Sequence, residues 1–349
     1  MKTTTKSLLM FVMAALFALI LGACSSNKDA DDKTADKESG ASNDTQYPIE
    51  IKHALGTTTI EKKPERVATI AWGNQDVALA LGTVPVGFSA ANYGIKDNDT
   101  GMLPWTQEKV EELGEKNPTI YQDTAGLDFE AIADSQPDVI LAAYSGLTQE
   151  DYDKLKKIAP VVAYQNQPWV TSWRDMIKYD AMAMGMEKEG EQLIKDTEKT
   201  IQDAAAKYPD LKDKKAAFVA FDATGFSKFY VYTTGDPRGE MLEELGMSYP
   251  ESVKAQIKDD ASFYVELSAE NADALNDADI LVTYGTDKTL KALQKDPILG
   301  KVPAIKAGNV VVIEDNTPLA AAGTPSPLSI PYTIDEYASK ISDVAKNVK

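Results

Sequence analysis

The longest helical pattern in the chain covers residues 187–208. Small and apolar side chains recur there at steps of three and four residues, as at Leu193, Thr197 and Ile201, and glutamate, lysine and aspartate take most of the other positions. No proline interrupts this pattern before Pro209. The spacing predicts one long amphipathic helix that buries a single face.

Two segments on either side of this helix share one helix–strand pattern. The first starts at Glu130 and the second at Glu270, and each runs through an amphipathic stretch and a polar turn into the motif Ile-Leu-x-x-Tyr, which ends at Tyr144 and Tyr284. A spacing of 140 positions is too long for a solenoid repeat. The pattern favours two similar α/β lobes joined by the helix 187–208, and the alternative is a chance resemblance between two ordinary helix–strand units.

Short apolar runs bounded by turn residues predict the strands of these lobes. Residues 139–143 form one such run, and alternating residues in 47–60 predict a β-hairpin in which His53 is a strand residue rather than a ligand. We therefore expect an N-terminal α/β lobe over residues 47–186 and a C-terminal α/β lobe over residues 209–349.

The N-terminus carries a targeting pattern. Two lysines precede an unbroken apolar run over residues 8–21, and the motif Leu21-Gly-Ala-Cys follows. The run is too short for a comfortable membrane span and predicts an export signal over residues 1–23. Cys24 is the only cysteine and its context resembles the bacterial lipobox, which implies cleavage before Cys24 and its lipidation. The alternative is ordinary cleavage that leaves a free thiol.

Residues 24–46 contain almost nothing that could be buried. Serine, asparagine, aspartate, lysine and threonine dominate this segment. Such a composition predicts a disordered tether between the lipidated cysteine and the folded part of the protein.

Composition limits the chemistry that the chain can perform. The 349 residues include 43% hydrophobic and 26% charged residues, and the formal net charge is −18, which argues against a nucleic-acid partner. One cysteine and one histidine exclude an intrachain disulfide and make a metal site of several His or Cys ligands untenable. Histidine-dependent nucleophile arrangements and glycine-rich phosphate loops are missing, although counting residues does not rule out a pair of catalytic carboxylates.

Aromatic residues are concentrated at the predicted strand ends, where ligands bind in open α/β sheets. They give rigid contact area with a polar tip, which suits a bulky amphiphilic ligand. We expect Phe263 and one of Tyr230 and Tyr232 to close the core instead. The aromatic candidates for ligand contact are Trp72, Tyr144, Trp173, Tyr230, Tyr232, Tyr264 and Tyr284.

Arginine is scarce, with three residues in the whole chain. Arg174 and Arg238 each follow a predicted turn at the start of a helix, where a fixed guanidinium could meet a cluster of anionic oxygens. Arg66 precedes a buried strand and is expected to form a structural ion pair. Arg174 and Arg238 are therefore added to the candidate ligand-binding residues.

The chain resembles the lipoprotein substrate-binding components of iron–siderophore ABC importers over nearly all of residues 47–348. No single motif carries the resemblance, but the order of several motifs along the chain is specific. The motifs include Pro64-Glu-Arg-Val, Leu81-Gly-Thr-Val-Pro-Val-Gly, Gln136-Pro-Asp-Val-Ile-Leu, Tyr144-Ser-Gly-Leu-Thr, Gly235-Asp-Pro-Arg and Ser326-Pro-Leu-Ser.

The resemblance implies two Rossmann-like lobes joined by one long α-helix, with a ferric siderophore held in a largely pre-formed cleft between them. The siderophore's own oxygens would coordinate the iron, so no cofactor and no direct metal ligand is expected. Glu130 and Glu270 would dock to the permease subunits of the importer. The implied protein is a monomeric, non-enzymatic binding protein, lipid-anchored at the outer face of the cytoplasmic membrane of a Gram-positive bacterium.

Other readings stay open at this point. A haem- or cobalamin-binding protein could share the fold, although haem would need a tyrosine or methionine ligand here. A surface-anchored carboxylate hydrolase and an adhesin without a small ligand are alternatives of other classes. Few arginines mean that catecholate, hydroxamate and carboxylate siderophores all remain possible.

Overall fold

The computed structural model describes residues 45–95, 100–123, 125–222, 225–258 and 262–348. The predicted signal peptide, Cys24 and nearly all of the predicted tether lie outside these ranges. No helix within them is both long and apolar enough to cross a membrane.

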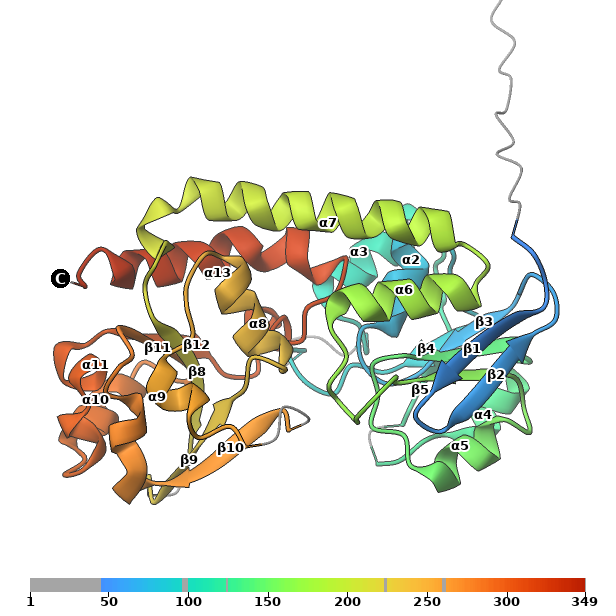
Figure 1. The fold of residues 1–349 in the computed structure, drawn as a ribbon. Coiled ribbons are helices and arrows are strands. Elements are labelled where there is room, and N and C mark those ends of the chain that lie inside the picture. Colours follow the sequence, from blue (N-terminus) through green and yellow to red (C-terminus); the bar gives the residue numbers. More distant parts are fainter. Residues whose placement is uncertain (1–44, 96–99, 124, 223–224, 259–261, 349) are drawn as a thin grey trace, which may run out of the picture. The chain divides into compact units, whose positions relative to one another are not determined.

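The N-terminal lobe is built on a five-stranded parallel sheet in the order β5-β4-β3-β6-β7 (Figure 1). Every residue of the inner strand β6 is buried, as expected for a parallel strand covered on both faces. The strands are β3 (Val67–Thr69), β4 (Gly87–Ser89), β5 (Ile120–Tyr121), β6 (Val139–Ala142) and β7 (Val161–Ala163). The helices of this lobe are α2 (Asn74–Ala80), α3 (Pro104–Glu112), α4 (Phe129–Asp134), α5 (Gln149–Leu155) and α6 (Trp173–Ala183).

A separate antiparallel hairpin of β1 (Ile49–His53) and β2 (Gly56–Ile60) precedes this sheet. His53 ends β1, which confirms that it is a strand residue. The hairpin is tied to the lobe because the Thr58 hydroxyl donates to the carbonyl of Val161 in β7 at 2.5 Å.

The C-terminal lobe has a second five-stranded sheet, in the order β10-β9-β8-β11-β12. Its strands are β8 (Ala216–Phe221), β9 (Lys228–Tyr232), β10 (Tyr264–Ser268), β11 (Ile280–Gly285) and β12 (Val310–Glu314), and β9 runs antiparallel to both of its neighbours. The helices are α8 (Pro237–Glu244), α9 (Glu251–Lys254), α10 (Thr289–Lys295), α11 (Pro303–Ala307), α12 (Pro318–Ala321) and α13 (Ser329–Ala345), with 3₁₀ turns η1 (Pro209–Leu211), η2 (Ala269–Leu275) and η3 (Leu299–Lys301).

The two sheets place the repeated segments at equivalent positions. β6 lies between β3 and β7, and β11 lies between β8 and β12. The helical parts differ, because Glu130 belongs to an α-helix and Glu270 belongs to the 3₁₀ turn η2. The predicted two-lobed α/β class is thus confirmed, and the repeat is conserved in topology more closely than in local helix type.

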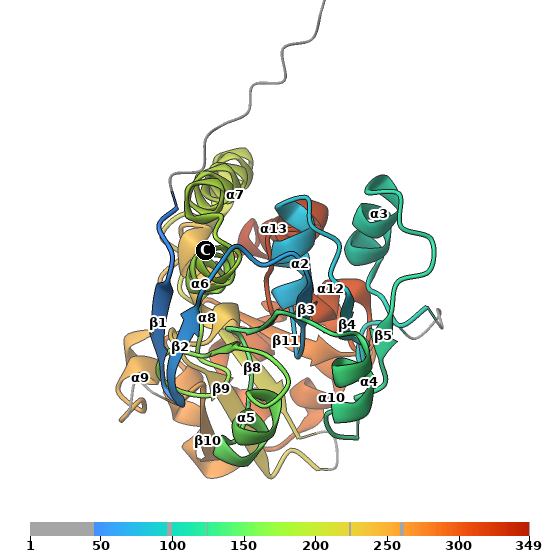
Figure 2. The same cartoon turned by 90° about the vertical axis from the view of Figure 1, so that its right-hand side faces the viewer.

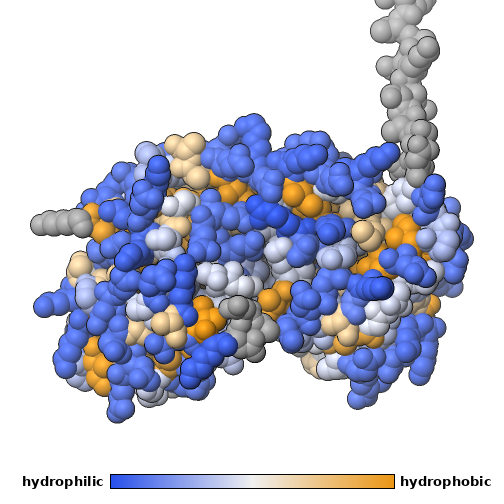
Figure 3. Space-filling model, in the orientation of Figure 1, coloured by the Kyte–Doolittle hydropathy of each residue, from blue (hydrophilic) through white to orange (hydrophobic). Residues whose placement is uncertain are grey.

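The long helix α7 (Glu187–Lys207) runs beside α6 of the first lobe and α13 of the second (Figures 1 and 2). Gly190 permits the close approach to α6, because a Cβ atom at this position would lie 2.4 Å from the Cβ of Ala181. Thr197, Ile201 and Ala204 continue the buried face. Hydrophilic side chains cover most of the face shown in Figure 3, including the outward surface of α7.

Two further boundaries that the sequence predicts are wrong. Proline, glycine, serine and alanine dominate residues 318–331 and predict a loop, but the segment holds α12 and the first turn of α13. Thr317 caps α12 ahead of Pro318, and the Ser326 hydroxyl accepts from the Ser329 amide. The sequence also predicts one helix that opens with Trp169 and Trp173, but this helix begins only at Trp173, where Ser172 provides the N-cap.

Candidate functional site

A cavity of about 390 Å³ lies between the lobes, at the ends of strands from both sheets. Aromatic side chains supply most of its wall. The N-terminal lobe contributes Trp72, Tyr93, Tyr144 and Trp169, and the C-terminal lobe contributes Tyr232, Arg238, Phe263, Tyr284, Ala320, Ala321 and Thr324.

A second cavity of about 230 Å³ adjoins the first and shares Trp72 and Trp169 with it. It is formed by the N-terminal lobe, at the carboxyl ends of its parallel strands, where α/β sheets bind ligands. Its lining is more polar and includes Ser89, Asn92, Asp123, Ser145 and Asp151. The two cavities together have the size of a site for a small organic ligand.

Asn74 fixes the backbone that presents Trp72 and Tyr144. Its side-chain amide donates to the carbonyl of Ile70 at 2.7 Å and to that of Tyr144 at 3.0 Å, and its oxygen accepts from the Tyr144 amide at 3.1 Å. Asn74 is fully buried at the start of α2. It therefore joins the exits of β3 and β6 and holds both aromatic side chains at one edge of the sheet.

Among the lining residues that the structure describes, Arg238 is the one lysine or arginine in either cavity. Its guanidinium lies 3.7 Å from the centre of the Tyr232 ring and forms two hydrogen bonds of 2.7 Å with the carboxylate of Asp236, which is fully buried. Burial alone would lower the pKa of Arg238, but the bonds to Asp236 outweigh it and the pKa is raised. The positive charge that Arg238 brings to the site is thus already paired with the carboxylate of Asp236.

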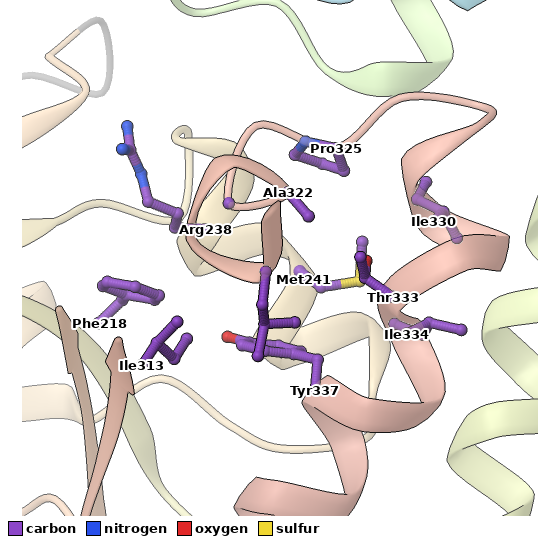
Figure 4. Close-up of a pocket in the computed structure, with 12 residues that line it drawn as sticks. Phe218, Arg238, Met241, Ile313, Ala322, Pro325, Ile330, Thr333, Ile334 and Tyr337 are labelled. Carbon is purple, nitrogen blue, oxygen red and sulfur yellow. The ribbon is translucent and has the colours of Figure 1, made fainter. Parts of the chain in front are cut away.

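A small apolar cavity of about 30 Å³ lies beneath Arg238 in the C-terminal lobe, with room for one or two water molecules. Met241, Ile330 and Tyr337 are among its walls, and the guanidinium of Arg238 extends away from it (Figure 4). This cavity belongs to the packing between α8, α12 and α13 rather than to the interlobe site.

The tyrosines of the interlobe cavity are neutral hydrogen-bonding groups at physiological pH. Burial raises the pKa of Tyr144 to about 12, and burial with the acceptor Asp315 raises that of Tyr93 to about 12. Burial also raises the pKa of Tyr284, whose hydroxyl donates to the carbonyl of Ala320 at 3.3 Å. No tyrosine here is poised as a phenolate.

The structure corrects the placement of Trp173 and Arg174, which line neither cavity. Trp173 is 1% exposed and donates its indole N–H to Glu244 of α8 at 3.2 Å. Arg174 binds Glu198 of α7 at 2.7 Å and also contacts Glu244. The first turn of α6 faces α7 and α8, so these residues connect helices instead of facing a ligand.

Among the other candidates, Trp72, Tyr144, Tyr232, Arg238 and Tyr284 are brought together in the interlobe cavity. Two further candidates, Tyr230 and Tyr264, lie outside it. Tyr264 is the cross-strand partner of Tyr232, and its ring packs edge-on against Tyr230 at 5.4 Å between centroids.

Three cavity residues were missed or misplaced from the sequence. Phe263 was expected in the core but is half-exposed and lines the cavity. Trp169 has a φ of 63°, which keeps it out of the helix, and its ring packs against Tyr144 at 5.5 Å. Tyr93 lies in a loop that was expected to reach the crevice, and its hydroxyl accepts from the Asn316 amide of the other lobe at 3.1 Å.

Glu130 and Glu270 are both exposed, in the first turns of α4 and η2. Arg66 lies ahead of β3 and donates to the carbonyls of Ser135 at 2.5 Å and Gln136 at 2.7 Å. It is therefore a structural residue, but its partners are carbonyl groups rather than the ion pair that was expected.

Comparison with known proteins identifies the architecture. Residues 67–317 match the periplasmic binding protein family. The crystal structure of PiaA from Streptococcus pneumoniae TIGR4 in complex with ferrichrome is 58% identical, with a TM-score of 0.83 over 86% of this chain and 100% of that one. SirA from Staphylococcus aureus complexed with staphyloferrin B is 28% identical, with a TM-score of 0.65 over 84% of this chain and 98% of that one.

A further relative is described as a binding protein for ferric citrate. The Fe(3+)-citrate-binding protein YfmC of Bacillus subtilis (strain 168) is 25% identical over 322 residues, which are 91% of this chain and 92% of the relative. The family consists of solute-binding proteins rather than enzymes. The chain belongs to the periplasmic binding protein family.

Proposed function

We propose that this protein captures a ferric siderophore of the hydroxamate class between its lobes and delivers it to an ABC importer. The observation that carries the proposal is the aromatic wall of the interlobe cavity, where Arg238 is the one lysine or arginine among the described lining residues and is paired with Asp236. The 58% identity to PiaA, whose structure holds ferrichrome, supports the same ligand class.

Charge balance favours a hydroxamate over a catecholate ligand. Three hydroxamates carry three negative charges, which one ferric ion balances, whereas a ferric tris-catecholate is a trianion. Removing a trianion from water would require several unpaired cations in the wall. The wall offers one compensated guanidinium and neutral tyrosine hydroxyls, which suit an uncharged complex with many oxygen atoms.

We extend the proposal to the route of delivery. Lipidation of Cys24 would hold the protein at the outer face of the cytoplasmic membrane of a Gram-positive bacterium, with residues 24–46 as the tether. The exposed Glu130 and Glu270 would dock to basic residues of the permease, one from each lobe. A monomer suffices for this function.

The alternatives have less support. A haem or cobalamin site has no support from the relatives described above, whose names give ferrichrome, staphyloferrin B and ferric citrate as ligands. The carboxylates Asp123 and Asp151 line a cavity, but every relative described above is a binding protein rather than a hydrolase.

The test is a tryptophan-fluorescence titration of the purified protein with ferric hydroxamate, ferric catecholate, ferric citrate, haemin and cobalamin. We expect saturable quenching by the ferric hydroxamate at the lowest concentration, because Trp72 and Trp169 line the site. Saturation by haemin or cobalamin, with no response to any ferric siderophore, would overturn the function. Tighter binding of the catecholate would overturn the ligand class alone.

A further inference from the structure

The two adjoining cavities differ in charge. The interlobe cavity contains Arg238 and the tyrosines, whereas the described lining residues of the N-terminal lobe's cavity include two carboxylates, Asp123 and Asp151, and no lysine or arginine. We call the latter cavity the acidic pocket. A ligand that fills both cavities therefore meets a negative wall at one end only.

Asp123 is held in place before any ligand arrives. The Ser89 hydroxyl donates to Asp123 Oδ2, and Ser89 in turn accepts from the Ala71 amide at 2.9 Å. Burial raises the pKa of Asp123, since the bond from Ser89 compensates only part of the lost hydration. The carboxylate thus lies at the end of β5 without a cationic partner among its hydrogen bonds.

Asp151 and Ser145 complete the polar wall. Asp151 accepts from the Thr148 hydroxyl at 2.7 Å, and the nearby Lys154 binds Glu150 instead, at 2.8 Å. Ser145 is 1% exposed and lines the pocket, yet its hydroxyl has no hydrogen-bond partner in the described part of the chain. A buried hydroxyl without a partner is uncommon, and it points to a polar group that the pocket is built to receive.

We propose that the acidic pocket receives a primary ammonium arm of the ferric siderophore, with Asp123 as its main acceptor and Asp151 and Ser145 as secondary contacts. This inference rests on the proposed function, because it assumes that a ferric hydroxamate occupies the adjoining cavity. It fixes the orientation of the ligand, with the metal-bound oxygens toward Arg238 and the tyrosines and the cationic arm toward the N-terminal lobe. It also predicts selectivity between siderophores that share the same iron centre.

The test uses two linear ferric trihydroxamates that differ only in their terminal amine, which is free in one and acetylated in the other. Both are titrated into the full protein by calorimetry at pH 7. We expect the free amine to bind about tenfold more tightly, because a partly buried ion pair forms only with that ligand. In Asp123→Asn this preference falls to about one, and the affinity for the acetylated ligand stays within about twofold.

Matched variants distinguish a direct contact between the pocket carboxylates and the ammonium group from a general effect of the protein's negative charge. Asp153→Asn removes a carboxylate of α5 that pairs with Lys156 outside the pocket, and it should leave the tenfold preference unchanged. Asp151→Asn provides a second pocket variant that should reduce the preference even if Asp123→Asn folds poorly.

The same titrations distinguish a failure of the ammonium-arm inference from a failure of the proposed function. Equal binding of the two trihydroxamates by the wild type, or a preference that survives both pocket substitutions, overturns the inference and leaves the function intact. Absence of binding for both ligands, with saturation by haemin or cobalamin, overturns the function itself.

Discussion

The hydroxyl of Ser326 in the C-terminal lobe donates to Asp76 Oδ2 in the N-terminal lobe at 2.5 Å, and both residues are buried. Asp76 also accepts from the Trp105 indole at 2.9 Å and from the Thr106 hydroxyl at 2.7 Å. One carboxylate thus connects α2, α3 and the segment that precedes α13. This connection restrains the separation of the lobes in addition to α7.

We expect Ser326→Ala to weaken that restraint. The substitution removes one donor from a buried carboxylate and should lower the free energy of unfolding by about 1–3 kcal/mol. Chemical denaturation monitored by circular dichroism measures this change. Ser339→Ala, a half-exposed position in the middle of α13, is the control and should change the stability by less than about 0.5 kcal/mol. Equal effects at the two positions would show that the contact between Ser326 and Asp76 contributes nothing.

A second prediction concerns the pair of Arg238 and Asp236. Arg238→Ala would leave the fully buried Asp236 carboxylate uncompensated, and we expect it to lower the free energy of unfolding by about 3–5 kcal/mol. The double variant Arg238→Ala with Asp236→Asn removes the charge together with its partner, and it should recover a large part of that loss. A double-mutant cycle in denaturant measures the coupling. Additive effects would mean that the two side chains act independently.

The repeat of Glu130–Tyr144 and Glu270–Tyr284 could be recognised from the sequence because a buried strand leaves an unbroken apolar run. The repeat predicted the two lobes, and it singled out Tyr144 and Tyr284, which both line the interlobe cavity. For Trp169 and Trp173 the prediction and the structure differ, because the sequence suggested Trp173 as a ligand contact whereas Trp169 lines the cavity. Backbone geometry explains this difference. Both tryptophans precede the same predicted helix, and only the positive φ of Trp169 and the N-cap at Ser172 decide which of them faces the cavity.

The supporting polar residues could not be predicted from the sequence. Asn74 and Asp76 lie in the polar first turn of α2, and nothing in the local pattern indicates partners that are 70 or 250 positions away in the chain. The acidic pocket could not be predicted for the same reason, since Ser89, Asp123 and Ser145 lie at the carboxyl ends of three different strands. Only the order of the strands in the sheet brings them together.

The placement of the two tryptophans gives a third prediction. Trp169→Ala removes a wall shared by both cavities and should weaken binding of the ferric siderophore by about 30-fold, the usual size of a central aromatic contact. Trp173→Phe should leave the affinity within about twofold and instead lower the stability, because it removes the donor to Glu244 from a buried interface. Calorimetric titration and thermal unfolding of both variants separate these effects. A large loss of affinity in Trp173→Phe would restore the role that the sequence suggested.

His53 gives a prediction for acidic pH. Thr58 Oγ1 donates to Val161, so it accepts from His53 Nε2 at 3.0 Å, and His53 Nδ1 accepts from the Leu55 amide at 3.3 Å. Both ring nitrogens are occupied in the neutral form, and burial lowers the pKa below its ordinary value of 6.5. Because the unfolded chain binds this proton more readily, stability is full above pH 6.5 and is lost as the pH falls through the folded pKa.

His53→Gln is the matched variant for that prediction, since a glutamine has no charge to gain. The difference in unfolding free energy between pH 7.5 and pH 5 should be smaller in the variant than in the wild type. The proton signals of the single histidine, followed by NMR across the same range, report its pKa directly. A value at or above 6.5 would contradict the neutral, hydrogen-bonded imidazole.

Glu240 gives the opposite dependence on pH. Burial, followed by repulsion from Glu244, raises its pKa to about 7, although Arg174 lies 3.6 Å away and opposes the shift. The folded protein therefore holds this proton more tightly than the unfolded chain, whose glutamate has its ordinary pKa of 4.5. The stabilisation is full below pH 4.5 and is lost as the pH rises through about 7.

Glu240→Gln keeps the side chain neutral at every pH and so removes this loss. At pH 8 we expect the variant to be more stable than the wild type by about 1–3 kcal/mol, with allowance for the partial exposure of the side chain, and the two proteins to converge near pH 5. The exposed neighbour Glu243→Gln is the control and should follow the wild type at both pH values. Parallel stability curves for Glu240→Gln and the wild type would mean that Arg174 keeps Glu240 ionised in the folded protein.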